Sequence, residues 1–102
     1  MTEIASTSAE DARSRVEKGA LLIDVRSDAG RAATGEIAGA TIVAKTDVAA
    51  FAEGLDKDQD VVIFCGTTAG SGPVADWLDN AGFTAVSHVD GGYEALRDAT
   101  GA

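Results

Sequence analysis

Two segments of the chain are almost continuously apolar, and they restrict the possible folds most strongly. Residues 20–25 read Ala-Leu-Leu-Ile-Asp-Val, and residues 60–64 read Asp-Val-Val-Ile-Phe. A strand with one face in water alternates apolar and polar residues, whereas runs of this kind are typical of strands buried on both faces. Such strands occur in parallel sheets that helices cover on both sides. We therefore predict that both segments lie inside a sheet of that type.

Helical segments alternate with strand segments along the rest of the chain. A capping box formed by Thr7 and Glu10 predicts the start of the first helix, and Gly72-Pro73 predicts the start of a later one. The expected helices cover residues 8–18, 28–34, 46–53, 72–81 and 93–99, and the other expected strands cover residues 2–6, 40–43 and 84–89. This order predicts a three-layer α/β fold, in which helices lie on both faces of a mostly parallel five-stranded sheet, as one domain over residues 1–102.

The charge balance limits the partners that the chain can bind. It has 17 acidic and 8 basic residues, which give a formal net charge of −9. Such a chain repels phosphate backbones, so we expect no nucleic-acid partner. We also expect no membrane partner, because no segment approaches the ~20 apolar residues of a membrane helix and no basic cluster is present. The N-terminus lacks the features of a signal peptide, and a single cysteine fits a reducing compartment, so we expect a cytoplasmic protein.

The single cysteine, Cys65, follows the second apolar run at the predicted carboxyl end of a strand. Ligands of parallel sheets bind at this edge. The next residues are small, so the chain can curl and direct successive N–H groups at an anion, beside the positive end of the following helix. We therefore predict a catalytic Cys65 thiolate, held with its substrate by Gly66, Thr67, Thr68, Ala69, Gly70 and Ser71. The competing interpretation is a small buried apolar side chain.

The other residue types narrow the chemistry open to this thiol. The chain has one histidine, His88, which falls in a predicted strand and is interpreted as structural. It has no Cys-x-x-Cys motif and no constellation of metal ligands, so we expect neither dithiol redox chemistry nor a metal or other cofactor. A thiolate without a partner base suits attack on sulfur, because that step needs little proton transfer.

In order and spacing, several motifs resemble those of a single-domain rhodanese, over essentially the whole chain. They are residues 22–26 (Leu-Ile-Asp-Val-Arg), 35–40 (Gly-Glu-Ile-Ala-Gly-Ala), 62–65 (Val-Ile-Phe-Cys) and 90–93 (Asp-Gly-Gly-Tyr). The resemblance implies a sulfurtransferase that carries a sulfane sulfur as a persulfide on Cys65. The donor would be a small sulfur compound or a protein persulfide, and the acceptor a protein thiol or another nucleophile. It also implies that Asp24 and Arg26 support the site, although both also fit a purely structural pair.

The chain departs from the family pattern after the cysteine. Thr68 stands where the family has Gly, and Gly70 stands where it has Arg. Upstream, Glu36 replaces a His and Ala38 replaces a Pro. The segment after the cysteine therefore carries no cation, so we expect the thiosulfate dianion to be a poor donor, unless Arg31 reaches the site from the long connection over residues 26–39.

These departures leave a second interpretation open. The domain could be a non-catalytic rhodanese-like module that binds a protein partner or senses redox state, although the retained Cys65 argues against this. A cysteine-dependent phosphatase is disfavoured, because it needs an arginine where this chain has Ser71.

Overall fold

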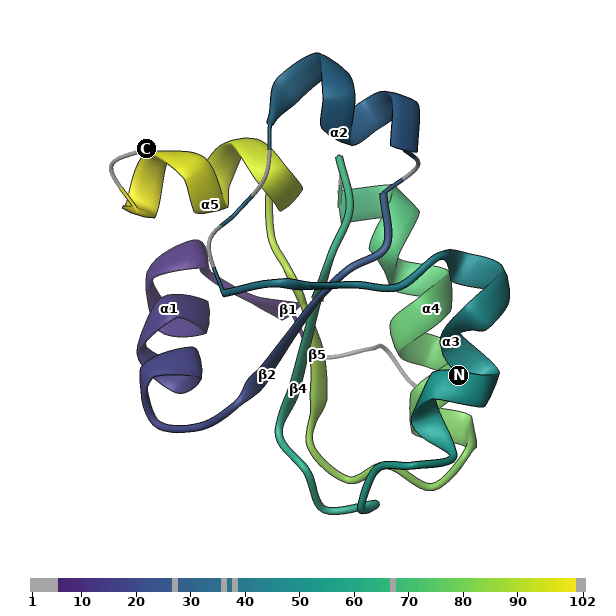
Figure 1. The fold of residues 1–102 in the computed structure, drawn as a ribbon. Helices are drawn as coiled ribbons and strands as arrows, with labels where there is room; N and C mark the ends of the chain where they lie inside the picture. The colour runs from purple at the N-terminus through teal and green to yellow at the C-terminus, as the bar shows by residue number, and fades with distance from the viewer. Residues whose placement is uncertain (1–5, 27, 36, 38, 67, 101–102) are drawn as a thin grey trace.

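The computed structural model describes residues 6–26, 28–35, 37, 39–66 and 68–100. Along the chain, five helices and a short 3₁₀ turn alternate with the strands (Figure 1). The elements are β1 (Ser6–Thr7), α1 (Ala9–Glu17), β2 (Leu21–Asp24), α2 (Asp28–Thr34), β3 (Thr41–Ile42), η1 (Lys45–Asp47), α3 (Val48–Ala52), β4 (Val61–Phe64), α4 (Thr68–Asn80), β5 (Val86–Val89) and α5 (Gly92–Thr100).

The strands form one sheet in the order β1-β5-β4-β2-β3, and every pair of neighbours is parallel. The outer strands β1 and β3 have two residues each. Strand β4 pairs with β2 so that Leu21 lies opposite Val61 and Asp24 opposite Phe64. The carboxyl ends of β2 and β4 therefore lie at the same level of the sheet. The predicted α/β class with a parallel sheet is confirmed.

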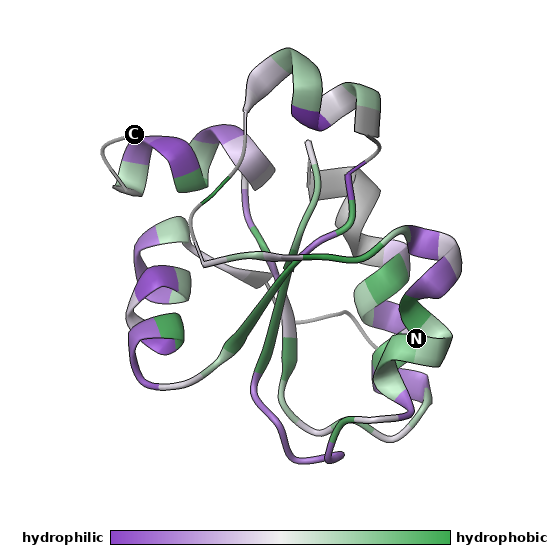
Figure 2. Ribbon diagram, in the orientation of Figure 1, coloured by the Kyte–Doolittle hydropathy of each residue, from purple (hydrophilic) through white to green (hydrophobic). Residues whose placement is uncertain are grey.

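Helices pack on both faces of the sheet and form two apolar clusters. Helices α1 and α5 lie on one side of the strands, and α3 and α4 lie on the other (Figure 1). Successive residues of β4 point to alternate clusters: Val62 and Phe64 join the α1–α5 cluster, and Val61 and Ile63 join the α4 cluster. All residues of β4 are buried, and β4 is among the most apolar segments (Figure 2). The prediction of a strand buried on both faces is confirmed.

The start of α1 differs from the prediction. Ser8, and not Thr7, is the N-cap residue, and its hydroxyl accepts a hydrogen bond from the Asp11 backbone N–H at 3.1 Å. Thr7 belongs to β1 instead, where it pairs with Val89 of β5. The predicted Thr7–Glu10 capping box is therefore wrong, because the sheet fixes Thr7 as strand and moves the cap to the next residue.

Several other boundaries shift by a few residues. Helix α4 begins at Thr68, earlier than Gly72-Pro73 predicts, so Pro73 lies inside the helix. Proline is favoured in the first helical turn but can lie deeper at the loss of one backbone hydrogen bond. Asp47 precedes α3, but its side chain makes no capping hydrogen bond among the described residues. Most of the predicted strand 2–6 lies outside the described residues, and only Ser6 belongs to β1.

Among the described residues, no helix combines the length and the apolar character that crossing a bilayer requires.

Candidate active site

Cys65 lies directly after β4, at the carboxyl edge of the sheet, as a partly exposed free thiol. Two hollows border it. The α5 hollow has a volume of about 250 Å³ and is lined by Arg26, Gly30, Thr34, Cys65, Gly66, Tyr93 and Glu94. The Lys45 hollow has a volume of about 380 Å³ and is lined by Val25, Arg26, Ala44, Lys45, Thr46 and Cys65. The thiol is therefore reached from two sides, and Arg26 is the other residue that both hollows share.

The turn before α5 holds the backbone of Cys65 in place. The Tyr93 N–H donates a hydrogen bond to the Cys65 carbonyl oxygen at 2.8 Å. Gly92 has φ +60°, and a Cβ added there would lie 2.6 Å from the same oxygen and 3.1 Å from two atoms of Gly66. Only glycine permits this approach, because the space beside the Cys65 carbonyl is too small for a side chain.

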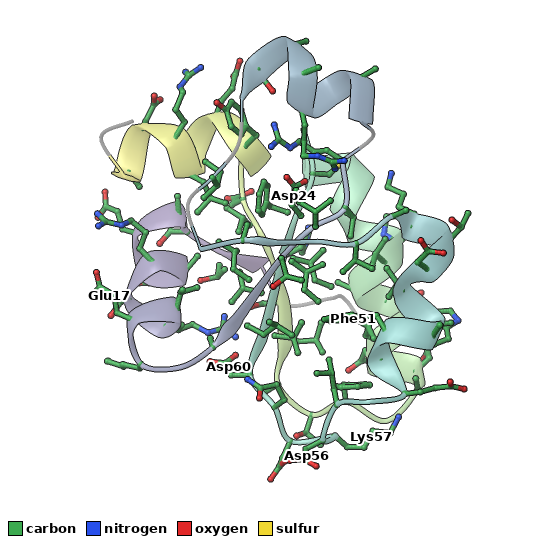
Figure 3. The ribbon with its side chains drawn as sticks, viewed as in Figure 1. Glu17, Asp24, Phe51, Asp56, Lys57 and Asp60 are labelled. Carbon is green, nitrogen blue, oxygen red and sulfur yellow. The ribbon has the colours of Figure 1, made fainter. Side chains whose placement is uncertain are left out.

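Arg26 and Asp24 form a buried ion pair beside the thiol. The side chains are 3% and 1% exposed, and Arg26 Nη2 lies 2.8 Å from Asp24 Oδ2. Arg26 Nε contacts both carboxylate oxygens, at 3.0 and 3.1 Å. Asp24 ends β2 near the carboxyl edge of the sheet, and Asp60 lies at the opposite, amino edge (Figure 3). The contacts with Arg26 show that the Asp24 carboxylate compensates the positive charge of the guanidinium.

The remaining contacts of Arg26 fix its guanidinium in one orientation. Its Nη1 donates to Thr34 Oγ1 and its Nη2 to the Gly35 carbonyl, each at 2.8 Å. The guanidinium carbon lies 4.3 Å from the centroid of the Tyr93 ring, a cation–π contact. Arg26 lines both hollows, whereas Asp24 lines neither. The geometry shows a buried ion pair whose arginine lines both hollows, and its supporting role in the site stays a prediction.

Tyr93 joins three segments at this edge, because its hydroxyl also donates to the Thr34 carbonyl at 2.5 Å. The change Tyr93→Phe keeps the ring over Arg26 and removes that hydrogen bond. We expect the free energy of unfolding to fall by about 1 kcal/mol, the usual net contribution of one such bond. Urea titration of the wild type and the variant measures the difference. A loss above about 3 kcal/mol would show that the hydroxyl does more than hold α2 to α5.

The predicted substrate-binding segment is largely the start of a helix. Gly66 lines the α5 hollow, and Thr67 lies outside the described residues. Thr68, Ala69, Gly70 and Ser71 belong to the first turn of α4. The prediction of a curled loop over these four residues is wrong, because their backbone is helical. The first N–H groups of a helix lack partners within it, so this turn still offers donors and a positive dipole end close to Cys65.

Lys45 and Glu94 also line the hollows, and neither was predicted from the sequence. Lys45 follows the short strand β3, and Glu94 lies in the first turn of α5. Both residues lie in segments that follow the carboxyl end of a strand. Because ligands of parallel sheets bind at that edge, these segments could have been proposed as part of the site. Arg31 lines neither hollow, and its Nη1 donates to the Arg26 carbonyl at 2.7 Å. His88 is buried within β5.

Comparison with known proteins identifies the family. A family model described as a rhodanese-like domain matches residues 8–99. The chain belongs to the rhodanese-like family. The thiosulfate sulfurtransferase GlpE of Pseudomonas fluorescens (strain SBW25) is 34% identical over 97 residues, which cover 95% of this chain and 88% of that protein. The resemblance that the motifs predicted is confirmed.

Solved structures agree with the rhodanese-like assignment. The solution structure of the rhodanese-like domain from the Anabaena sp. Alr3790 protein has a TM-score of 0.76 and 26% identity, and the match covers 96% of this chain and 75% of that one. The crystal structure of reduced CoADR-RHD from Bacillus anthracis has a TM-score of 0.81 and 24% identity. That match covers 96% of this chain but only 17% of the larger one, and it supports the fold alone.

Among the described residues, no group of three or more His, Cys, Asp or Glu side chains is placed to hold a metal ion.

Proposed function

We propose that this rhodanese-like protein is a sulfurtransferase that carries a sulfane sulfur on Cys65. The observation that carries the proposal is the position of the free thiol, at the carboxyl end of β4 between two hollows. The relative named thiosulfate sulfurtransferase, which matches nearly the whole chain, supports the same reaction. Asp24 and Arg26 support the site, and the backbone from Gly66 to Ser71 contributes to substrate binding.

The reaction has two displacement steps. The Cys65 thiolate attacks the sulfane sulfur of the donor, so a new S–S bond forms while the bond to the rest of the donor breaks. The leaving group departs with the electron pair; from thiosulfate it is sulfite. An acceptor nucleophile then attacks the outer sulfur of the persulfide, and the Cys65 thiolate leaves in its original form. The nucleophilic thiolate performs both steps without a second protein thiol.

Several features of the site favour an anionic sulfur on Cys65. Helix α4 begins three residues after Cys65, so its first N–H groups and dipole stabilise negative charge there. The Tyr93 N–H engages the Cys65 carbonyl and keeps the backbone fixed while the side chain gains and loses a sulfur. This arrangement supports stabilisation of the persulfide by backbone groups that the fold already holds near Cys65.

Sulfur loading tests the proposed function directly. The protein is incubated with thiosulfate, mercaptopyruvate or glutathione persulfide, and its intact mass is measured before and after addition of cyanide. We expect the wild type to gain one sulfur from at least one donor and to release it as thiocyanate. We expect Cys65→Ala to gain none, because the chain has no other cysteine.

A negative result has a defined meaning. If no donor adds sulfur to the folded wild type, the sulfurtransferase proposal fails, and a non-catalytic module for protein binding or redox sensing becomes the better interpretation. If Cys65→Ala gains sulfur as readily as the wild type, the role assigned to Cys65 fails. Circular dichroism of both proteins confirms that the comparison is made between folded chains.

A further inference from the structure

The two hollows beside Cys65 differ in charge. The α5 hollow contains the carboxylate-bearing Glu94 and the compensated Arg26. The Lys45 hollow contains Arg26 and Lys45, and no acidic residue is among those that line it. Glu94 therefore borders Cys65 on one side and Lys45 borders it on the other; Lys45 also lines a separate hollow, which includes Pro73 and Trp77 of α4.

Arg26 is a weak candidate for binding that anion. Its Nε and Nη2 are directed at the Asp24 carboxylate, and further donors are directed at Thr34 and Gly35. Ion pairing and burial leave little of its charge for a ligand. Among the ion pairs of the described residues, none involves Lys45, whose side chain is exposed. The nearest acidic residue along the chain, Asp47, is also exposed and lines neither hollow.

From these contacts we infer that Lys45 binds the anionic group of the sulfur donor in the Lys45 hollow. The substrate class is a small donor of the thiosulfate or thiosulfonate type, whose sulfane sulfur is bonded to an oxidised, anionic sulfur group that leaves as sulfite or a sulfinate. The ammonium group contacts that anion, and the hydroxyl of Thr46 in the same hollow is a further donor. The anion is held on the β3 side, so the sulfane sulfur faces Cys65. This inference rests on the proposed function, and it supplies the cation that the segment after Cys65 lacks.

A pair of alkylating reagents tests the role of Lys45 without any sulfur transfer. Iodoacetate and iodoacetamide differ chiefly in charge, and Cys65 is the one thiol that they can modify. The ratio of their rate constants cancels any change in thiol reactivity that both reagents share. We expect Lys45→Gln to lower the iodoacetate-to-iodoacetamide ratio about three- to fivefold, the scale of one exposed ion pair. We expect Lys45→Arg to keep most of the ratio.

Lys18→Gln is the matched control. It removes the same charge from the end of α1, which leads into the amino end of β2, on the opposite edge of the sheet from Cys65. At about 0.1 M salt, charges more than ~10 Å away are largely screened, so this variant should leave the ratio almost unchanged. Equal effects of Lys18→Gln and Lys45→Gln would overturn the inference, because the protein's overall charge would then explain both.

Thiosulfate turnover with cyanide as acceptor gives the second measurement. Lys45→Gln should lower kcat/KM for thiosulfate about three- to fivefold, mainly through KM, because Lys45 contacts the donor and not the transferred sulfur. An unchanged kcat/KM would overturn the inference for this donor. If the wild type transfers no sulfur from any donor, the proposed function fails. The alkylation ratio still decides whether Lys45 attracts anions to Cys65.

Discussion

Replacement of Asp24 by Asn is expected to lower the free energy of unfolding by about 3–5 kcal/mol, because it leaves Arg26 buried without a counter-charge. Asn has nearly the same shape as Asp, so the loss reports charge and not volume. Both side chains of the pair are at most 3% exposed, so water cannot replace the missing carboxylate. A loss of this size is a large fraction of the roughly 5–15 kcal/mol that stabilises a typical domain.

A double-mutant cycle separates the pair from its surroundings. Urea unfolding is measured for Asp24→Asn, Arg26→Met and the double variant. We expect the double variant to be more stable than the sum of the single losses predicts, because it removes both buried charges together. Additive losses would show that the two side chains do not stabilise each other. A loss below about 1 kcal/mol for Asp24→Asn would show that the buried charge of Arg26 does not require this carboxylate.

Gly92→Ala is expected to lower both stability and the reactivity of Cys65. The new Cβ would lie 2.6 Å from the Cys65 carbonyl oxygen, so either the α5 turn or the Cys65 backbone must move. Left-handed backbone strain contributes about 1–2 kcal/mol, and the displaced backbone contributes about 1–3 kcal/mol more. Because the displaced backbone carries the thiol, we also expect Cys65 in the folded variant to react several-fold more slowly with iodoacetamide.

Gly39→Ala is the control for this change. Gly39 also has a positive φ, +85°, but a Cβ there would meet nothing within 4 Å. It therefore reports backbone strain without a clash, and we expect a loss of about 1–2 kcal/mol and unchanged alkylation of Cys65. Equal losses of stability in the two variants, with equal alkylation rates, would show that the approach of Gly92 to Cys65 is unimportant.

Local patterns predicted the parts of the fold that depend on neighbouring residues. The apolar run before Cys65 became β4, and the helix expected at residues 28–34 has those bounds in the structure. The cap of α1 was mispredicted because Thr7 and Ser8 are both good N-cap residues. The choice between them depends on β1 pairing with β5, a contact that no local pattern reveals. The early start of α4 was not predicted because Gly72-Pro73 was interpreted as the first turn of the helix, whereas Pro73 lies inside it.

The candidate site could be predicted only in part, for the same reason. The position of Cys65 follows from the strand before it, and Asp24 ends a strand of the same type that Arg26 follows. Lys45 was missed because its approach to Cys65 depends on the order of strands in the sheet, with β3 beside β2. The contact of Gly92 with Cys65 likewise joins distant segments. A residue's place at the edge of a parallel sheet is known only when its neighbours are known.

The hydrogen bond from Tyr93 to the Cys65 carbonyl has a consequence for the newly made chain. Tyr93 lies near the end of the chain, well after Cys65, so the partner of the Cys65 carbonyl belongs to the last part of the chain to be made. Strand β1, although made first, must also wait for β5 before it can pair. Until the C-terminal segment folds onto the sheet, Cys65 lacks the turn that fixes its backbone. A chain that ends before Tyr93 would therefore keep Cys65 but lack the contact that holds its backbone, and the site is complete only when the C-terminal segment has been made.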